Sequence, residues 1–157
     1  MQKITTYLTF AERGEEAVNF YVSLFPNSGI NNIVRYGDGG PFPAGSLLNA
    51  SFALDGQEFM AMDAGSHFHF AEGISLMVDC KTQEEVDRYY DGLAEGGEKQ
   101  PCGWVKDRWG VSWQIVPSAL GELMGSPNRA KAQKVMEALM PMHKIDIATL
   151  QRAYDRG

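Results

Sequence analysis

Alternating apolar and polar residues near the start of the chain predict a half-buried strand. Over residues 4–10, Ile4, Leu8 and Phe10 fall on one side, and Tyr7 lies among threonines on the other. A period of two residues is typical of a strand that packs one face on a core. We therefore expect Ile4, Leu8 and Phe10 to be buried.

A helical period follows in the segment GEEAVNFYVSLF, and Pro26 ends it. Its apolar positions are Ala17, Phe20, Tyr21, Leu24 and Phe25. Three further strands are predicted at residues 30–36, 47–54 and 58–63. The segment GDGGPFPAG separates the first two of these strands, and the hairpin signal Asp55-Gly56 separates the last two.

The same order of elements then begins again. A strand at residues 74–80 precedes TQEEVDRYYDGLAEGG, a helix capped by Thr82 and stopped by two glycines. The helices share a Glu-Glu pair, and Gly56 and Gly110 are each followed three residues later by an aromatic residue. We therefore predict an α+β fold of two βαβββ modules, residues 1–66 and 67–118, with mainly antiparallel curved sheets around one concave cavity.

The remaining residues, 119–157, predict a helical extension of the same single domain, which spans residues 1–157. The middle helix of the extension carries one apolar stripe: Ala132, Val135, Met136, Leu139 and Met140. The next helix carries Ile147, Leu150 and Tyr154 on its own stripe. Because these stripes are wide for a small domain, we expect a symmetric homodimer in which the extension packs partly on the partner.

Composition narrows the class of protein. The chain has 157 residues, 44% of them hydrophobic, and a net charge of −6, with no basic run interleaved with aromatics. Nucleic acid and membranes are therefore poor partners, and without a signal peptide pattern a cytoplasmic location is expected. Cys80 and Cys102 are expected to be reduced thiols.

Several motifs together resemble a known family. They are ITTYLTF, EEAVNFYVSLFP, GQEFMAMDAG, SHFHF, ISLMVDC, EEVDRYYDGLAEGG, CGWVKDRWGVSWQIVP and, in the extension, KAQKVMEALMPMHKIDIATLQRAY. They are similar to the PhnB-like branch of the vicinal oxygen chelate superfamily, often labelled 3-demethylubiquinone-9 3-methyltransferase domain. The resemblance implies a fold like that of glyoxalase and bleomycin-resistance proteins.

The resemblance also implies where metal ligands would lie. In metal-dependent members, four inward-facing side chains come from the first and last strands of both modules, which here are Thr5, Met60, Ser75 and Gln114. Two hydroxyls, a thioether and an amide do not make a divalent metal site. No cofactor is therefore expected, and the alternative is a divalent metal bound by His67 and His69 of SHFHF, which otherwise form a solvated loop.

Two interpretations of Gln114 stay open. It is either a hydrogen-bonding group on a cavity wall that also includes Tyr7, Trp104 and Trp113, or a structural residue bonded to nearby backbone. The tryptophans have a corresponding alternative as core residues. The charged run Lys106-Asp107-Arg108 is interpreted as a solvated hairpin turn.

Two functional hypotheses follow. The first is a protein that binds a small molecule without catalysis, and the second is an enzyme of the same superfamily with an altered or absent metal site. Methyl transfer is disfavoured, because no glycine-rich loop joins a parallel strand to a helix, and GDGG lies between two strands.

Overall fold

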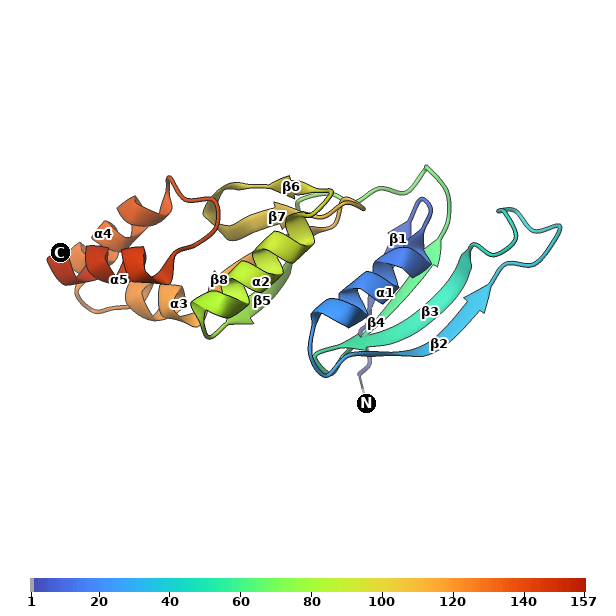
Figure 1. Cartoon of the computed structure of the whole chain (residues 1–157), viewed down its shortest axis with the longest axis horizontal. Helices are drawn as coiled ribbons and strands as arrows, with labels where there is room; N and C mark the ends of the chain where they lie inside the picture. Colours follow the sequence, from blue (N-terminus) through green and yellow to red (C-terminus); the bar gives the residue numbers. More distant parts are fainter. Residues whose placement is uncertain (1) are drawn as a thin grey trace. The chain divides into compact units, whose positions relative to one another are not determined.

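The computed structural model describes residues 2–157 and divides the chain into two compact units. The first ends at His69 and the second runs from Phe70 to Gly157 (Figure 1). The sequence predicts one domain whose modules meet at residue 66 and whose helical extension begins at residue 119. In the structure the extension belongs to the second unit.

The first unit is a βαβββ module, as predicted. Its elements are β1 (Thr6–Phe10), α1 (Gly14–Leu24), β2 (Gly29–Arg35), β3 (Leu47–Leu54) and β4 (Gln57–Asp63). The strand order is β1-β4-β3-β2, with β1 parallel to β4 and the other neighbours antiparallel. The predicted burial of Leu8 and Phe10 is confirmed, but Ile4 lies before the strand and is 87% exposed.

Local chemistry sets the ends of these elements. Helix α1 ends at Leu24 because the residue before Pro26 is forced out of the helical region, and Phe25 is extended. Asp55 and Gly56 form the predicted hairpin turn, with φ values of 47° and 81°. Two consecutive left-handed residues are what a type I′ turn requires.

The second unit repeats the module. Its elements are β5 (Leu76–Cys80), α2 (Gln83–Ala94), β6 (Glu98–Lys99), the 3₁₀ turn η1 (Pro101–Gly103), β7 (Trp104–Lys106) and β8 (Ser112–Pro117). The strand order β5-β8-β7-β6 matches the first sheet position by position, again with one parallel pair, β5 with β8. Thr82 caps α2 as expected, because its side chain accepts a hydrogen bond from Glu85 N.

The extension forms three helices: α3 (Ser118–Met124), α4 (Arg129–Leu139) and α5 (Ile147–Arg156). Four residues make its core, Val135, Leu139, Ile145 and Leu150, with half-buried methionines, leucines and Tyr154 around them. The predicted stripe residues Val135, Leu139 and Leu150 are therefore buried against their own chain. Met140, placed on the same stripe, is 61% exposed.

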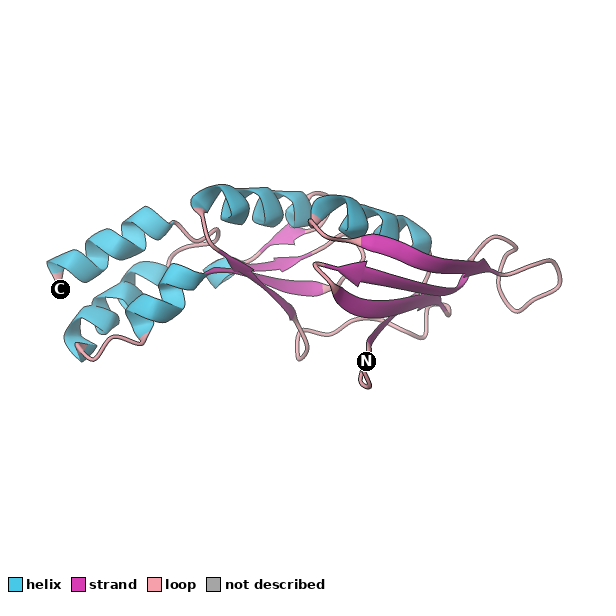
Figure 2. Cartoon of the chain, turned by 90° about the horizontal axis from the view of Figure 1, so that it is seen from below, coloured by secondary structure: helices cyan, strands magenta, loops and turns pink. Residues whose placement is uncertain are grey.

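Each sheet packs one face against the helix of its module (Figure 2). The opposite side of the first sheet, which we call face A, carries Tyr7, Asn49 and Met60. The opposite side of the second sheet, which we call face B, carries Met77, Trp104, Lys106, Ser112 and Gln114. This assignment follows from strand alternation, since the intervening residues Phe59, Val105 and Ile115 are buried.

Candidate functional site

Face B is built from the three longest strands of the second sheet. In the register, Gln114 of β8 lies between Met77 of β5 and Trp104 of β7. One step along β8 on the same face, Ser112 lies beside Lys106. A thioether, an indole, an amide, a hydroxyl and an ammonium group therefore share one surface.

Gln114 is half-buried and bonded to one partner. Its Nε2 donates a hydrogen bond of 2.9 Å to Ser75 Oγ. Among the described residues its Oε1 accepts no hydrogen bond, although an amide oxygen can accept two. The structure thus brings together two of the predicted site residues, Ser75 and Gln114, and leaves an acceptor available beside Trp104.

Ser112 was not singled out from the sequence. It is 1% exposed, and its Oγ has no hydrogen-bond partner among residues 2–157. A buried hydroxyl without a partner is uncommon in native proteins and requires an explanation such as a bound molecule or water. No sequence signal could have identified it, since serine in a strand is ordinary.

Lys106 is neutralised by an acidic neighbour. Its Nζ lies 2.5 Å from Glu72 Oε1, in the loop before β5. The hydrogen bond from Lys106 lowers the pKa of Glu72, and the same bond raises the pKa of Lys106. Face B therefore offers hydrogen bonds and flat apolar surface but little net charge.

Trp113 lies on the other side of β8. It is 2% exposed and packs on the helix side, where its Nε1 donates to Asp107 Oδ2 at 2.9 Å. Of the two tryptophans proposed for the cavity wall, Trp104 lies on face B and Trp113 is a core residue of the second unit.

Asp107 corrects the interpretation of the charged turn. Rather than being solvated, Asp107 is 3% exposed, and its Oδ1 accepts hydrogen bonds of 3.0 Å from Trp109 N and Val111 N. A carboxylate that bonds the backbone two residues later is the Asx turn that Asp favours, so the sequence did carry a signal for this role. Arg108, in contrast, is exposed as expected.

Face A contains the remaining predicted residues. Tyr7 of β1 pairs with Met60 of β4, and the Tyr7 hydroxyl donates to Asn49 Oδ1 at 2.8 Å. Partial burial raises the pKa of Tyr7, and the nearby Tyr36 raises it further. Thr5 lies directly before β1 and is half-buried. Face A therefore has a neutral phenol and an amide as its main polar groups.

The four positions that the resemblance assigns to metal ligands do not suit a divalent ion. They are Thr5, Met60, Ser75 and Gln114, and Ser75 already accepts a hydrogen bond from the Gln114 amide. Within residues 2–157 no three or more His, Cys, Asp or Glu side chains come together in a way that could hold a metal. Two hydroxyls, a thioether and an amide are poor ligands for a divalent ion, whereas the hydroxyls and the amide can form hydrogen bonds.

Within the part of the chain that the structure describes, no carboxylate joins the alternative histidine pair in a group that could hold a metal. His67 and His69 are exposed in the loop between β4 and β5. Of the acids near them in sequence, Asp63 is buried and accepts hydrogen bonds from Gly14 N at 2.8 Å and Leu47 N at 2.9 Å. Glu72 is bound to Lys106.

The cysteines differ in environment. Cys80 is fully buried, and burial raises the pKa of its thiol to about 12, which disfavours a nucleophilic thiolate. Cys102 is half-buried, with its sulfur 3.9 Å from Leu139 O. Neither residue lies on face A or face B.

Comparisons with known proteins match the two modules. The model of the 3-demethylubiquinone-9 3-methyltransferase family matches residues 2–116. The PhnB protein of Bacillus cereus is 43% identical, with a TM-score of 0.71, and the match covers 74% of this chain and 100% of that structure. The protein YjdN of Escherichia coli is 25% identical, over 71% of this chain and 92% of its own length.

A more distant structure shows the fold alone. The fosfomycin resistance protein FosX of Listeria monocytogenes is 16% identical, with a TM-score of 0.53, and the match covers 78% of this chain and 97% of that structure.

The family model ends before α3, so the extension lies outside it, although the sequence resemblance included the extension. No helix in the described part of the chain is long and apolar enough to cross a membrane. The family match covers well over half of the chain, and the fold agrees with it. The chain therefore belongs to the PhnB-like 3-demethylubiquinone-9 3-methyltransferase family.

Proposed function

We propose that the protein binds a small, partly planar organic molecule on face B without the metal centre of its superfamily. The observation that carries the proposal is the pairing of unused hydrogen-bonding capacity with apolar surface. Gln114 Oε1 and the buried Ser112 hydroxyl both lack a partner among the described residues, and Trp104 and Met77 flank Gln114. A donor group of the ligand would satisfy Gln114 Oε1, and a water that bridges to the ligand would satisfy the buried Ser112 hydroxyl.

The charge of face B indicates the ligand class. Because Glu72 neutralises Lys106, a strongly anionic ligand would have to compete for the ammonium group. A neutral molecule can stack on the Trp104 indole and form a hydrogen bond with the Gln114 amide without displacing Glu72 from Lys106. We therefore favour a neutral ligand with an aromatic or conjugated part.

Methyl transfer, which the family description names, has little support in the chain. The parallel strands lead into helices through short connections, residues 11–13 before α1 and residues 81–82 before α2, and neither contains glycine. The glycine-rich GDGG lies between β2 and β3. The usual methyl-donor site requires a glycine-rich loop between a parallel strand and a helix.

The test begins with mass spectrometry of small molecules that copurify with untagged protein. The molecule found is then titrated into wild type, Gln114→Ala and Ser112→Ala, with Gln151→Ala and Ser23→Ala as controls on exposed helix surfaces. Loss of a buried hydrogen bond should weaken binding by about 1 to 3 kcal/mol in the face B variants. Equal affinity in all five proteins would refute the assignment of face B.

A further inference from the structure

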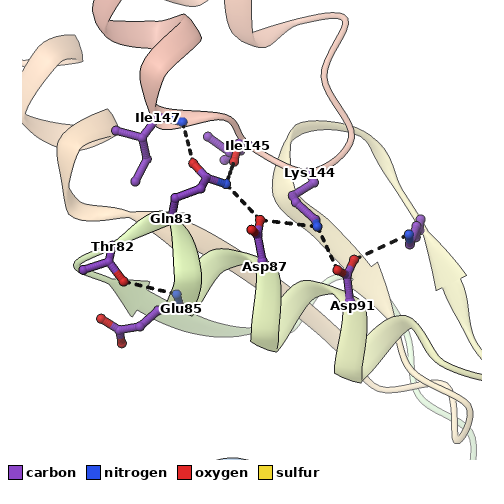
Figure 3. A network of polar contacts seen from close by, with 9 residues as sticks. Thr82, Gln83, Glu85, Asp87, Asp91, Lys144, Ile145 and Ile147 are labelled. Carbon is purple, nitrogen blue, oxygen red and sulfur yellow. Dashed lines mark hydrogen bonds and ion pairs between the residues drawn. The ribbon is translucent and has the colours of Figure 1, made fainter.

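Residues 142–147, which we call the tail anchor, connect α4 to α5 and contact two other elements of the second unit. One is α2, at Gln83, Asp87 and Asp91, and the other is η1 (Figure 3 shows the α2 side). The tail anchor lies beyond residue 116, where the family model ends. The family model therefore does not include the tail anchor or its contacts.

On the α2 side, one glutamine holds the backbone of the tail anchor at two points. Gln83 Nε2 donates to Ile145 O at 3.0 Å, and Gln83 Oε1 accepts from Ile147 N at 2.8 Å. Gln83 Nε2 also donates to Asp87 Oδ1 at 3.0 Å, which fixes the orientation of the amide (Figure 3). The side chain thus bonds a peptide segment much as a neighbouring strand would.

Lys144 adds an electrostatic contact to the same helix. Its Nζ lies 2.8 Å from Asp91 Oδ2 and 3.3 Å from Asp87 Oδ1 (Figure 3). Burial lowers the pKa of Lys144, but the hydrogen bonds to Asp91 and Asp87 outweigh it and leave the pKa raised.

On the other side, the tail anchor holds a strained turn. Cys102 N donates to Met142 O and Gly103 N donates to His143 O, both at 2.8 Å. Cys102 and Gly103 have φ values of 59° and 85°, and a non-glycine residue in this region is strained. A Cβ on Gly103 would lie 2.8 Å from Ile145 Cδ1, so the backbone of η1 and the tail anchor are in close contact.

The turn leads directly into face B. Trp104 follows Gly103 and is the β7 residue that pairs with Gln114. The Tyr90 hydroxyl of α2 also holds this region, because it donates to Gln100 O at 2.7 Å. The conformation of η1 determines where β7 begins and hence where the Trp104 indole lies.

We infer that the tail anchor positions Trp104 on face B, with Gln83 as the positioning residue. The extension then holds the Trp104 indole in position through η1, in addition to forming its own core. The inference rests on the proposed function for the importance of Trp104. The position of Trp104 is nevertheless measurable without any ligand.

The experiment uses full-length protein labelled with 5-fluorotryptophan, which gives one ¹⁹F resonance for each of the three tryptophans. Single Trp→Phe variants assign the resonances. Gln83→Ala should shift or broaden the Trp104 resonance and leave that of Trp113 unchanged, since Trp113 is held by Asp107. Amide exchange at Cys102 and Gly103 should accelerate roughly tenfold or more, because local opening exposes those N–H groups.

Gln151→Ala is the matched control, because the hydrogen bond that Gln151 makes among the described residues is to Asp155 within α5, and the variant should change neither readout. If Gln83→Ala does not fold, Lys144→Ala at the exposed ion pair replaces it, with a smaller change of the same kind expected. The inference would be overturned if Gln83→Ala accelerates amide exchange in α5 alone. In that case the ¹⁹F resonance of Trp104 and the amide exchange of Cys102 and Gly103 would be the same as in wild type. Since no ligand is added, this outcome is independent of whether face B binds one.

Discussion

At the scale of single residues, the second unit depends on two side chains of β8 that point in opposite directions. Gln114 lies on face B and bonds to Ser75, whereas its neighbour Trp113 lies in the core and bonds to Asp107. The sequence predicted a hydrogen-bonding role for Gln114, and the partner is a side chain rather than the backbone. A role for Gln114 in binding stays a prediction.

Alternation along β8 would have separated Trp113 from Gln114 from the outset. Residues 113 and 114 are consecutive in a strand, so they cannot both face one cavity. Ser112 could not be identified in this way, because its burial and lack of a partner depend on residues distant in sequence. Sequence patterns thus indicate the face of a residue better than its surroundings.

Asp107 gives a stability prediction at this scale. Asp107→Asn replaces one carboxylate oxygen by a donor and removes an acceptor used by Trp109 N, Val111 N or Trp113 Nε1. Leaving a buried donor without its partner should lower the free energy of unfolding by about 1 to 3 kcal/mol. Urea denaturation of wild type and Asp107→Asn measures this change in the free energy of unfolding.

The control for Asp107 is Asp38→Asn in the exposed loop between β2 and β3. Asp38→Asn should change the free energy of unfolding by less than about 0.5 kcal/mol. Equal stability of the two variants would mean that the Asp107 hydrogen bonds contribute nothing measurable.

At the scale of elements, nearly all strands and helices were predictable. The duplicated order followed from the period-two runs, the two Glu-Glu helix starts and the Asp55-Gly56 hairpin, all of which are local signals. The contacts of the extension were not predictable. Gln83 bonds residues more than sixty positions away, and no local pattern indicates such a partner.

The ion pairs of the tail anchor predict a dependence of stability on pH. The hydrogen bond from Lys144 lowers the pKa of Asp91 below its ordinary value of 3.8. A depressed pKa contributes stability that is present above the ordinary value and is lost as the pH falls through the folded value. The loss should therefore begin near pH 5 and continue to lower pH.

Lys144→Ala should remove this contribution, worth up to about 1 kcal/mol for a half-exposed pair. Wild type and variant should then differ in unfolding midpoint at pH 7 and converge toward pH 3, measured by urea denaturation at each pH. Asp87 and Lys99 are the other charged groups that contact the pair. Lys134→Ala, at the exposed pair with Glu137 inside α4, is the control and should show no such convergence.

At the scale of the whole molecule, the assembly is still a prediction. The stripes that suggested a dimer through the extension are buried in their own chain at Val135, Leu139 and Leu150. Among the described residues, the two most exposed large apolar side chains are Ile4 (87%) and Ile74 (81%), which precede the outer strands β1 and β5. Such sheet edges with apolar neighbours are natural sites of association.

We therefore expect a homodimer that pairs these edges. Light scattering should give a mass about twice the chain mass of 17.4 kDa. Ile74→Lys should shift the protein toward monomer, whereas Met140→Lys, on the exposed side of the extension, should not. If Met140→Lys shifts the protein toward monomer and Ile74→Lys does not, the dimer interface lies in the extension. A monodisperse wild-type monomer would exclude the dimer.

The central claim is that face B holds an organic molecule through Gln114 without a metal. Native mass spectrometry of untagged protein, purified without chelators, tests it most directly. We predict that each wild-type chain carries the mass of a small organic molecule and no divalent ion, and that Gln114→Ala, folded as wild type, loses that mass. A stoichiometric divalent ion on wild type, or equal retention of the molecule by Gln114→Ala, would contradict the account.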